Sequence, residues 1–235
     1  MDMERYGDYN EYEEDLPKSK NPVLLIIKIL ISLVCFTVIG VLVFRITFFN
    51  YYPDSIESLY FNDALTEYYN KNNRNIEVKT QEIRAKYDNP DVASFFCDNL
   101  YIIEGANQLQ LSIRFNESAI EYIEKELSLT GLDASDPELL SYKLATYNDE
   151  FKAEAYLKAE VQAVKYESKL MYHYYKLVCD GVKLGGLNNP GWIRLDIFVK
   201  GAEEKFASIY IYENNSSYSV FEDYELKRGD VPGDK

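Results

Sequence analysis

The chain has 235 residues, a formal net charge of −14 at pH 7 and 22 tyrosines, and 15% of its residues are aromatic. This aromatic content indicates a folded domain, because disordered chains are poor in aromatic side chains. The acidic balance argues against nucleic acid as a partner, since a phosphate-binding surface needs a basic patch.

The first segment, residues 1–21, is acidic and almost free of aliphatic side chains. Such a segment cannot bury enough apolar surface to fold, so we expect a disordered acidic cytoplasmic tail. The functional alternative is a docking peptide that presents Tyr6, Tyr9 and Tyr12 among carboxylates.

Residues 22–49 form the longest apolar run. A helix from Val23 to Phe44 would be about 33 Å long, close to the bilayer core of about 30 Å. Lys28 and Arg45 lie toward its two ends, where their side chains can extend to the headgroups. This segment is therefore predicted to be a transmembrane helix that binds the lipid bilayer.

The basic residues predict the orientation of this helix. Lys18, Lys20 and Lys28 lie on its amino-terminal side, and beyond Arg45 the next basic residue is Lys71. The positive-inside rule then places the amino terminus in the cytoplasm and the carboxyl-terminal domain outside the cell membrane. A cleaved secretory signal is the competing interpretation, but no small-x-small cleavage site follows the apolar run, so we expect a retained signal-anchor.

Residues 50–92 are predicted to form a helical neck. Asp54 and Glu57 have the spacing of a capping box, and a broad apolar face follows over residues 53–73. This helix either continues the membrane helix as a stalk or folds back on the domain.

Residues 93–227 are predicted to form a mainly β (α+β) domain. Leu109 to Phe115 alternate with polar residues, as in a strand with one buried and one wet face. Residues 152–166 favour helix by propensity, but their alternation favours a strand. The other predicted elements are a short inserted helix at 118–127 and strands at 139–147, 170–178, 193–199 and 207–212.

The separators between these strands are too short for crossover helices and contain turn-forming residues, so the strands should be antiparallel. We expect an antiparallel β-sandwich, loosely immunoglobulin-like, followed by a flexible tail at 228–235. That tail contains an Arg228-Gly229-Asp230 tripeptide, for which an ordinary terminal turn is the simpler interpretation.

Cys97 and Cys179 occupy similar local sequences, each beside a strand. A disulfide between them is compatible with an oxidising compartment. The alternative is two free thiols that serve as small core residues.

Four aromatic residues, Trp192, Phe198, Tyr210 and Tyr212, are candidates for a binding surface, and the alternation predicts that Tyr210 and Tyr212 share one face of their strand. Trp192 and Phe198 lie on the strand face opposite to Ile193, so they form an exposed patch unless another sheet covers them. In the alternative interpretation, the sandwich buries these rings in its core.

Catalytic signals are scarce. His173 is the only histidine, which rules out a histidine cluster for a metal, and no cofactor motif occurs. We therefore expect a binding or accessory module, not an enzyme, that contacts an envelope protein or a surface glycan. The alternatives are a carboxylate-dependent envelope hydrolase and a structural subunit of a membrane complex.

Overall fold

The computed structural model describes residues 22–45, 52–83, 95–148, 153–184, 191–213, 221–226 and 230–231. The chain divides into two compact units, Met1–Tyr51 and Tyr52–Lys235. The predicted tail at 1–21 lies outside the described residues.

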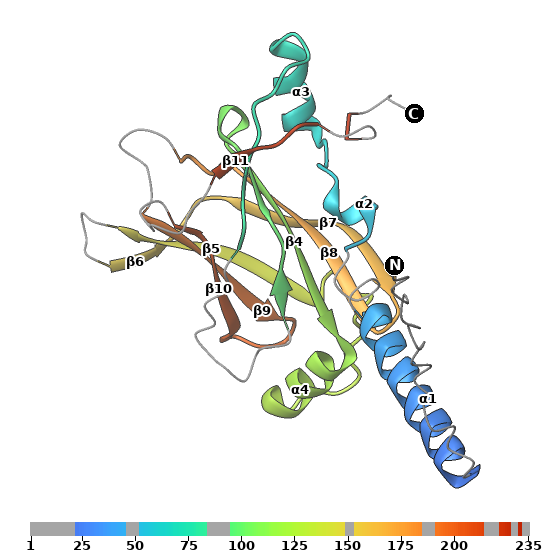
Figure 1. Cartoon of the computed structure of the whole chain (residues 1–235). Coiled ribbons are helices and arrows are strands. Elements are labelled where there is room, and N and C mark those ends of the chain that lie inside the picture. The colour runs from blue at the N-terminus through green and yellow to red at the C-terminus, as the bar shows by residue number, and fades with distance from the viewer. Residues whose placement is uncertain are drawn as a thin grey trace, which may run out of the picture. The chain divides into compact units, whose positions relative to one another are not determined.

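The first unit contains helix α1 (Pro22–Phe44), and none of its residues is buried (Figure 1). Among the described residues, α1 is the one helix that is long and apolar enough to cross a membrane by length and composition. The structure therefore confirms an apolar helix at the place where the sequence predicts one.

The second unit is mainly β, with two antiparallel sheets (Figure 1). The seven-stranded sheet has the order β11-β1-β3-β4-β8-β7, and β2 also pairs with β4. Its strands are β1 (Lys79–Gln81), β2 (Phe96–Cys97), β3 (Leu100–Ile103), β4 (Gln108–Asn116), β7 (Glu160–Lys169), β8 (Tyr172–Asp180) and β11 (Phe221–Asp223). The four-stranded sheet has the order β10-β9-β5-β6, made of β5 (Leu140–Asn148), β6 (Ala153–Tyr156), β9 (Trp192–Val199) and β10 (Lys205–Glu213).

The main core lies between the two sheets. Alternate residues of β4, such as Leu109 and Leu111, and of β9, such as Ile193 and Leu195, are buried in one cluster. This follows from the strand period of two, which sends every second side chain to the same face. The structure thus supports a sandwich-like arrangement of two antiparallel sheets.

The strand predictions agree with the structure. Of the described part of this segment, Ala153–Tyr156 form β6 and the residues from Glu160 onward belong to β7, so alternation outweighs helix propensity there. The inserted helix is α4 (Glu117–Leu127), whose N-cap is Asn116, with its side chain accepting from the Ala119 N–H at 3.1 Å.

The predicted continuous neck helix is wrong. The structure has two helices, α2 (Asp54–Glu57) and α3 (Asp63–Lys71), separated by an extended stretch. The amide of Gln110 on β4 explains the break, because it donates to the Tyr60 carbonyl and accepts from the Tyr60 N–H, both at 2.8 Å. These bonds replace those that a continuous helix would make.

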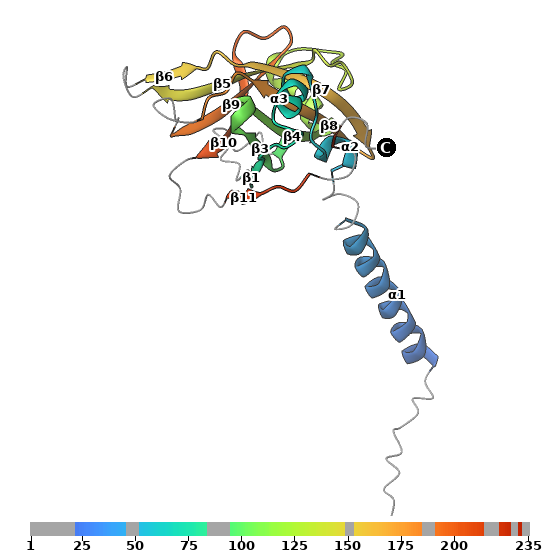
Figure 2. The same ribbon diagram turned by 90° about the horizontal axis from the view of Figure 1, so that it is seen from above.

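The neck folds back on the seven-stranded sheet, as one of the two sequence alternatives predicted. In both views α2 lies beside β8 (Figures 1 and 2), and the Ser112 hydroxyl donates to the Ile56 carbonyl at 3.0 Å. The polar face of β4, predicted to be wet, is therefore buried under the neck, including Gln108, Gln110 and Ser112.

The carboxyl-terminal segment also packs on the neck. Asp230 is buried, and its carboxylate accepts from the Leu59 N–H at 3.1 Å and from the Tyr224 hydroxyl at 2.9 Å. The aspartate of the Arg-Gly-Asp tripeptide is thus held by the domain and is not displayed.

Candidate functional site

The outer face of the four-stranded sheet brings together three of the four predicted aromatic residues. Ile193 and Leu195 of β9 point into the core, so Trp192 and Phe198 point away from it. Tyr210 of β10 lies on this outer face, and its ring centroid is 5.3 Å from that of Trp192 in an edge-to-face contact. The sandwich therefore does not bury these rings between its sheets.

The fourth predicted residue, Tyr212, lies elsewhere. It is buried in the core opposite Ile193, because a β-bulge shifts the register between Tyr210 and Tyr212. One extra residue in a strand reverses the side to which the following side chains point. The prediction that Tyr210 and Tyr212 share a face is therefore wrong.

Arg194 is the centre of the outer face. Its guanidinium donates to both oxygens of Glu154, at 3.0 and 2.8 Å, and to both oxygens of Asp196, at 2.7 and 3.2 Å. Arg194 and Asp196 lie two apart on β9, whereas Glu154 comes from β6. Two bidentate pairs hold the plane of the guanidinium in one orientation.

Asp196 anchors this arrangement from below. Its side chain is 0% exposed, and it also accepts from the Ser208 hydroxyl at 2.7 Å and from the Tyr156 hydroxyl at 3.2 Å. Burial raises the pKa of Asp196. The hydrogen bonds from Arg194 and Ser208 lower this pKa by more than burial raises it, so the net shift is downward. The carboxylate therefore stays ionised at neutral pH.

The charges of Arg194 and Tyr156 follow from the same contacts. Burial lowers the pKa of Arg194, but its bonds to Asp196 and Glu154 raise this pKa by more, so the guanidinium stays charged. Burial, and then the charge of Asp196, raise the pKa of Tyr156, so its phenol stays protonated.

Two cations lie over aromatic rings on this face. The Arg194 Cζ is 5.8 Å from the ring centroid of Trp192 and 5.9 Å from that of Tyr210. The Lys143 Nζ is 4.8 Å from the ring centroid of Phe198. The face thus combines half-buried rings with cations that contact them. Arg194 itself is only 6% exposed beneath these groups, whereas Lys143 is exposed. We use the name aromatic–arginine face for the set made of Trp192, Arg194, Phe198, Tyr210, Lys143 and Tyr156.

The polar members of this face were not predicted from the sequence. A signal exists in Ile193 to Ile197, where an arginine and an aspartate occupy alternate positions between core residues. The pairing with Glu154 could not be found this way, because it depends on β5 lying between β6 and β9.

Of the two alternatives for Cys97 and Cys179, the structure has the free thiols and no disulfide. Cys97 pairs with Ile113 on β4, and Cys179 pairs with Leu109 from β8 on the other side of β4. Two interstrand spacings separate the cysteines by about 10 Å across the sheet, and the offset along β4 from Leu109 to Ile113 separates them further. The Cα atoms therefore lie farther apart than the roughly 7 Å that a disulfide allows.

His173 links three elements. Its Nδ1 is 2.9 Å from the Tyr166 hydroxyl and its Nε2 is 2.8 Å from Glu117 Oε1, while its ring stacks on Phe115. The hydrogen-bonded row of Tyr166, His173 and Glu117 resembles a catalytic relay. Burial raises the pKa of Tyr166, however, so its phenol is a poor nucleophile. The contacts fit a structural role that fixes the first turn of α4 to β7 and β8.

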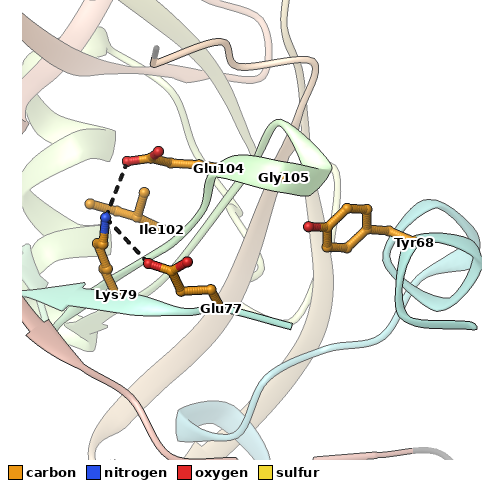
Figure 3. Close-up of a pocket in the computed structure, with 6 residues that line it drawn as sticks. All are labelled: Tyr68, Glu77, Lys79, Ile102, Glu104 and Gly105. Carbon is orange, nitrogen blue, oxygen red and sulfur yellow. Dashed lines mark ion pairs between the residues drawn. The ribbon is translucent and has the colours of Figure 1, made fainter. Parts of the chain in front are cut away.

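A small cavity of about 200 Å³ lies between α3, β1 and the turn η3 (Glu104–Ala106) (Figure 3). The Lys79 Nζ lies 3.5 Å from Glu77 and 3.8 Å from Glu104, so both carboxylates share one ammonium group. Tyr68 points toward Gly105, where a Cβ would collide with its hydroxyl. The cavity is smaller than the 300 Å³ or so that small-molecule sites usually have.

Lys176 is a buried charge that the sequence did not predict. It is 0% exposed beneath the neck, with its Nζ 4.6 Å from the Tyr101 ring centroid and 3.4 Å from the Glu57 carbonyl oxygen. Burial lowers the pKa of Lys176 to about 7, although Asp230 and Asp98 act in the opposite direction.

Within the ranges that the structure describes, no group of three or more His, Cys, Asp or Glu side chains could hold a metal ion. The aromatic–arginine face is therefore the candidate site with the most defined geometry. Comparison with known proteins finds no matching family model, no matching curated protein and no matching solved structure.

Proposed function

We propose that this chain is a single-pass membrane protein whose extracytoplasmic domain binds another protein of the same envelope through the aromatic–arginine face. In this proposal α1 is a retained signal-anchor with its amino terminus in the cytoplasm. The domain, loosely immunoglobulin-like in its layers, then acts as an accessory module held at high local concentration by the anchor.

The observation that carries the proposal is the fixed position of Arg194 between two carboxylates and two aromatic rings. Trp, Tyr and Arg are the residues that most often dominate the energy of protein interfaces. Their orientation is set before any partner arrives, so binding loses little side-chain entropy. A surface with only a structural role would not need these rings on the side away from the core.

The charge of the chain indicates the kind of partner. The domain is acidic overall, so long-range steering favours a partner with a basic rim around an apolar centre. A surface glycan is the other ligand that aromatic platforms contact, and the experiment below separates the two.

The test uses the full chain in its own membranes, with a photo-crosslinking amino acid in place of Tyr156, which is 52% exposed on the face. We expect a crosslinked protein that is lost in Trp192→Ala and in Tyr210→Ala. Tyr69→Ala on α3, a half-buried aromatic residue outside this face, is the matched control and should retain the crosslink.

Two results would contradict the proposal. A crosslink that persists unchanged in both face variants would show that the partner binds elsewhere. A crosslinked band that carbohydrate-cleaving treatment removes would show that the ligand is a glycan. A complex that survives purification at fixed stoichiometry would favour a structural subunit over an accessory module.

A further inference from the structure

The turn between β7 and β8 exposes two apolar side chains. Leu170 is 60% exposed and Met171 is 52% exposed. In the described part of the second unit, tyrosines aside, three large hydrophobic residues are exposed. They are Leu170, Met171 and Phe96. We call Phe96, Leu170 and Met171 the apolar tip.

The backbone of Leu170 adds a second observation. Its φ is +59°, in the left-handed region that favours glycine. Two-residue hairpin turns normally place Gly, Asn or Asp at such a position. An exposed leucine there suits neither the turn nor the surrounding water, so the fold alone does not explain it.

The apolar tip lies at the end of the domain where the chain enters it. The Arg114 guanidinium lies 5.1 Å from the ring centroids of both Phe96 and Tyr172 and 5.4 Å from that of Tyr52. Tyr172 directly follows Met171, and Tyr52 is the first residue of the second unit. One guanidinium therefore contacts the entry point of the chain, Phe96 of the tip and the residue that directly follows Met171.

The length of chain before Tyr52 limits how far this end can lie from the membrane helix. The chain from Arg45 to Tyr52 can span at most about 24 Å when fully extended. If α1 crosses a bilayer, the entry point and the apolar tip therefore stay within reach of the headgroup layer.

We propose that the apolar tip inserts into the interfacial layer of the same bilayer that holds α1 and thereby fixes the orientation of the domain on the membrane. This inference rests on the proposed function, in which α1 spans the bilayer. Leu170, Met171 and Phe96 would enter the acyl boundary, and Tyr172 suits the headgroup level.

The test reconstitutes the full chain in phosphatidylcholine vesicles, because neutral lipid does not repel the acidic domain. An environment-sensitive fluorescent amino acid replaces Lys169, which leaves the apolar tip intact. We expect blue-shifted emission that lipids with a spin label on the acyl chain quench. The same probe in place of Lys183, just beyond the other end of β8, should emit as in water and escape quenching.

Three variants examine the tip with the probe at position 169. Leu170→Ser with Met171→Ser should lose most of the quenching. Tyr147→Ser, which removes a 39% exposed ring from β5, is the matched control and should keep it. Leu170→Gly should raise the unfolding temperature, because glycine suits the left-handed backbone, and should still reduce quenching. A purely structural Leu170 would lower the unfolding temperature when replaced.

Alkaline carbonate extraction of the same vesicles separates the two proposals. If carbonate releases the chain, α1 is not an anchor, and both proposals fail. If the chain stays but the probe at 169 is no more quenched than the probe at 183, only the insertion of the tip is overturned. Quenching that persists in the double serine variant overturns it as well.

Discussion

The two outer faces of the sandwich both bury charged groups, but they bury them in different ways. On the seven-stranded sheet, Gln110 and Ser112 bond to the backbone of the neck, which covers Lys176. On the four-stranded sheet, Asp196 is covered by the side chains of its own neighbours, chiefly Arg194.

The difference indicates two roles. Bonds from side chains to a distant backbone specify where another segment of the chain must lie, so the first face is a completed internal interface. Bonds among side chains of one sheet specify only how those side chains point. The second face is therefore an ordered surface whose three rings, Trp192, Phe198 and Tyr210, stay half-exposed, and we propose that a partner covers it.

The largest expected effect comes from removing the anchor of the second face. Asp196→Ala leaves the buried Arg194 without one of its two carboxylates and should lower the free energy of unfolding by about 4 kcal/mol. Urea unfolding of the full chain in detergent measures this, with fluorescence of the only tryptophan, Trp192, as the signal.

Two further variants calibrate this result. Ser208→Ala removes one hydrogen bond to Asp196 and should cost about 1 kcal/mol. Glu126→Ala on the exposed side of α4 should change the free energy of unfolding by less than about 0.5 kcal/mol. If Asp196→Ala costs no more than Glu126→Ala, the polar cluster does not hold the second face in order.

The next effect concerns the first face and depends on pH. The pKa of Lys176 is about 7 in the folded chain, against an ordinary value of 10.5. Between these two values the unfolded chain holds more protons on this lysine than the folded chain does, so the contribution of Lys176 to stability rises with pH, by about 1 kcal/mol between pH 7 and pH 8. Below pH 7 both states carry the charge, and this contribution no longer changes.

Lys176→Met provides the control for this pH dependence. The variant should unfold at nearly the same urea concentration at pH 7 and pH 8, and at pH 7 it should be at least as stable as the natural chain. Both values lie below the range in which the buried thiols of Cys97 and Cys179, whose pKa burial raises, begin to destabilise the fold. The natural chain should show a clear rise between the same two pH values. Equal slopes in the two proteins would show that Lys176 is not the titrating group.

A smaller effect is expected where the neck contacts β4. Gln110→Ala leaves the N–H and carbonyl of Tyr60 without their partner and should cost about 2 kcal/mol. Gln162→Ala on the exposed side of β7 is the matched control and should cost less than about 0.5 kcal/mol. Hydrogen exchange at the Tyr60 amide should also speed up in Gln110→Ala. Unchanged exchange would show that this pair does not hold the neck.

Much of the fold was predictable because it depends on local alternation. Leu109 to Phe115 and Ile193 to Val199 place apolar residues at every second position, which is enough to predict a strand and its core face. The break in the neck was not predictable in this way. It depends on Gln110, which lies 50 residues from Tyr60 in the chain.

The candidate site was predictable only in part, for a similar reason. Trp192, Phe198 and Tyr210 could be found as aromatic residues on outer strand positions. The bulge that sends Tyr212 into the core has no clear signal, since Ile211 resembles any other strand residue. The partner of Arg194 on β6 required the strand order, which the sequence does not show.

The smallest expected effect on stability concerns Lys143, whose ammonium group lies over the rings of Phe198 and Tyr156 on the second face. Lys143→Gln should lower the free energy of unfolding by only about 0.5 kcal/mol, since an exposed cation–π contact is weak. The same variant should reduce the crosslink from position 156 clearly, because Lys143 lies where a partner would contact the rings. A loss of stability with no loss of crosslinking would mean that Lys143 stabilises the fold but does not contact the partner.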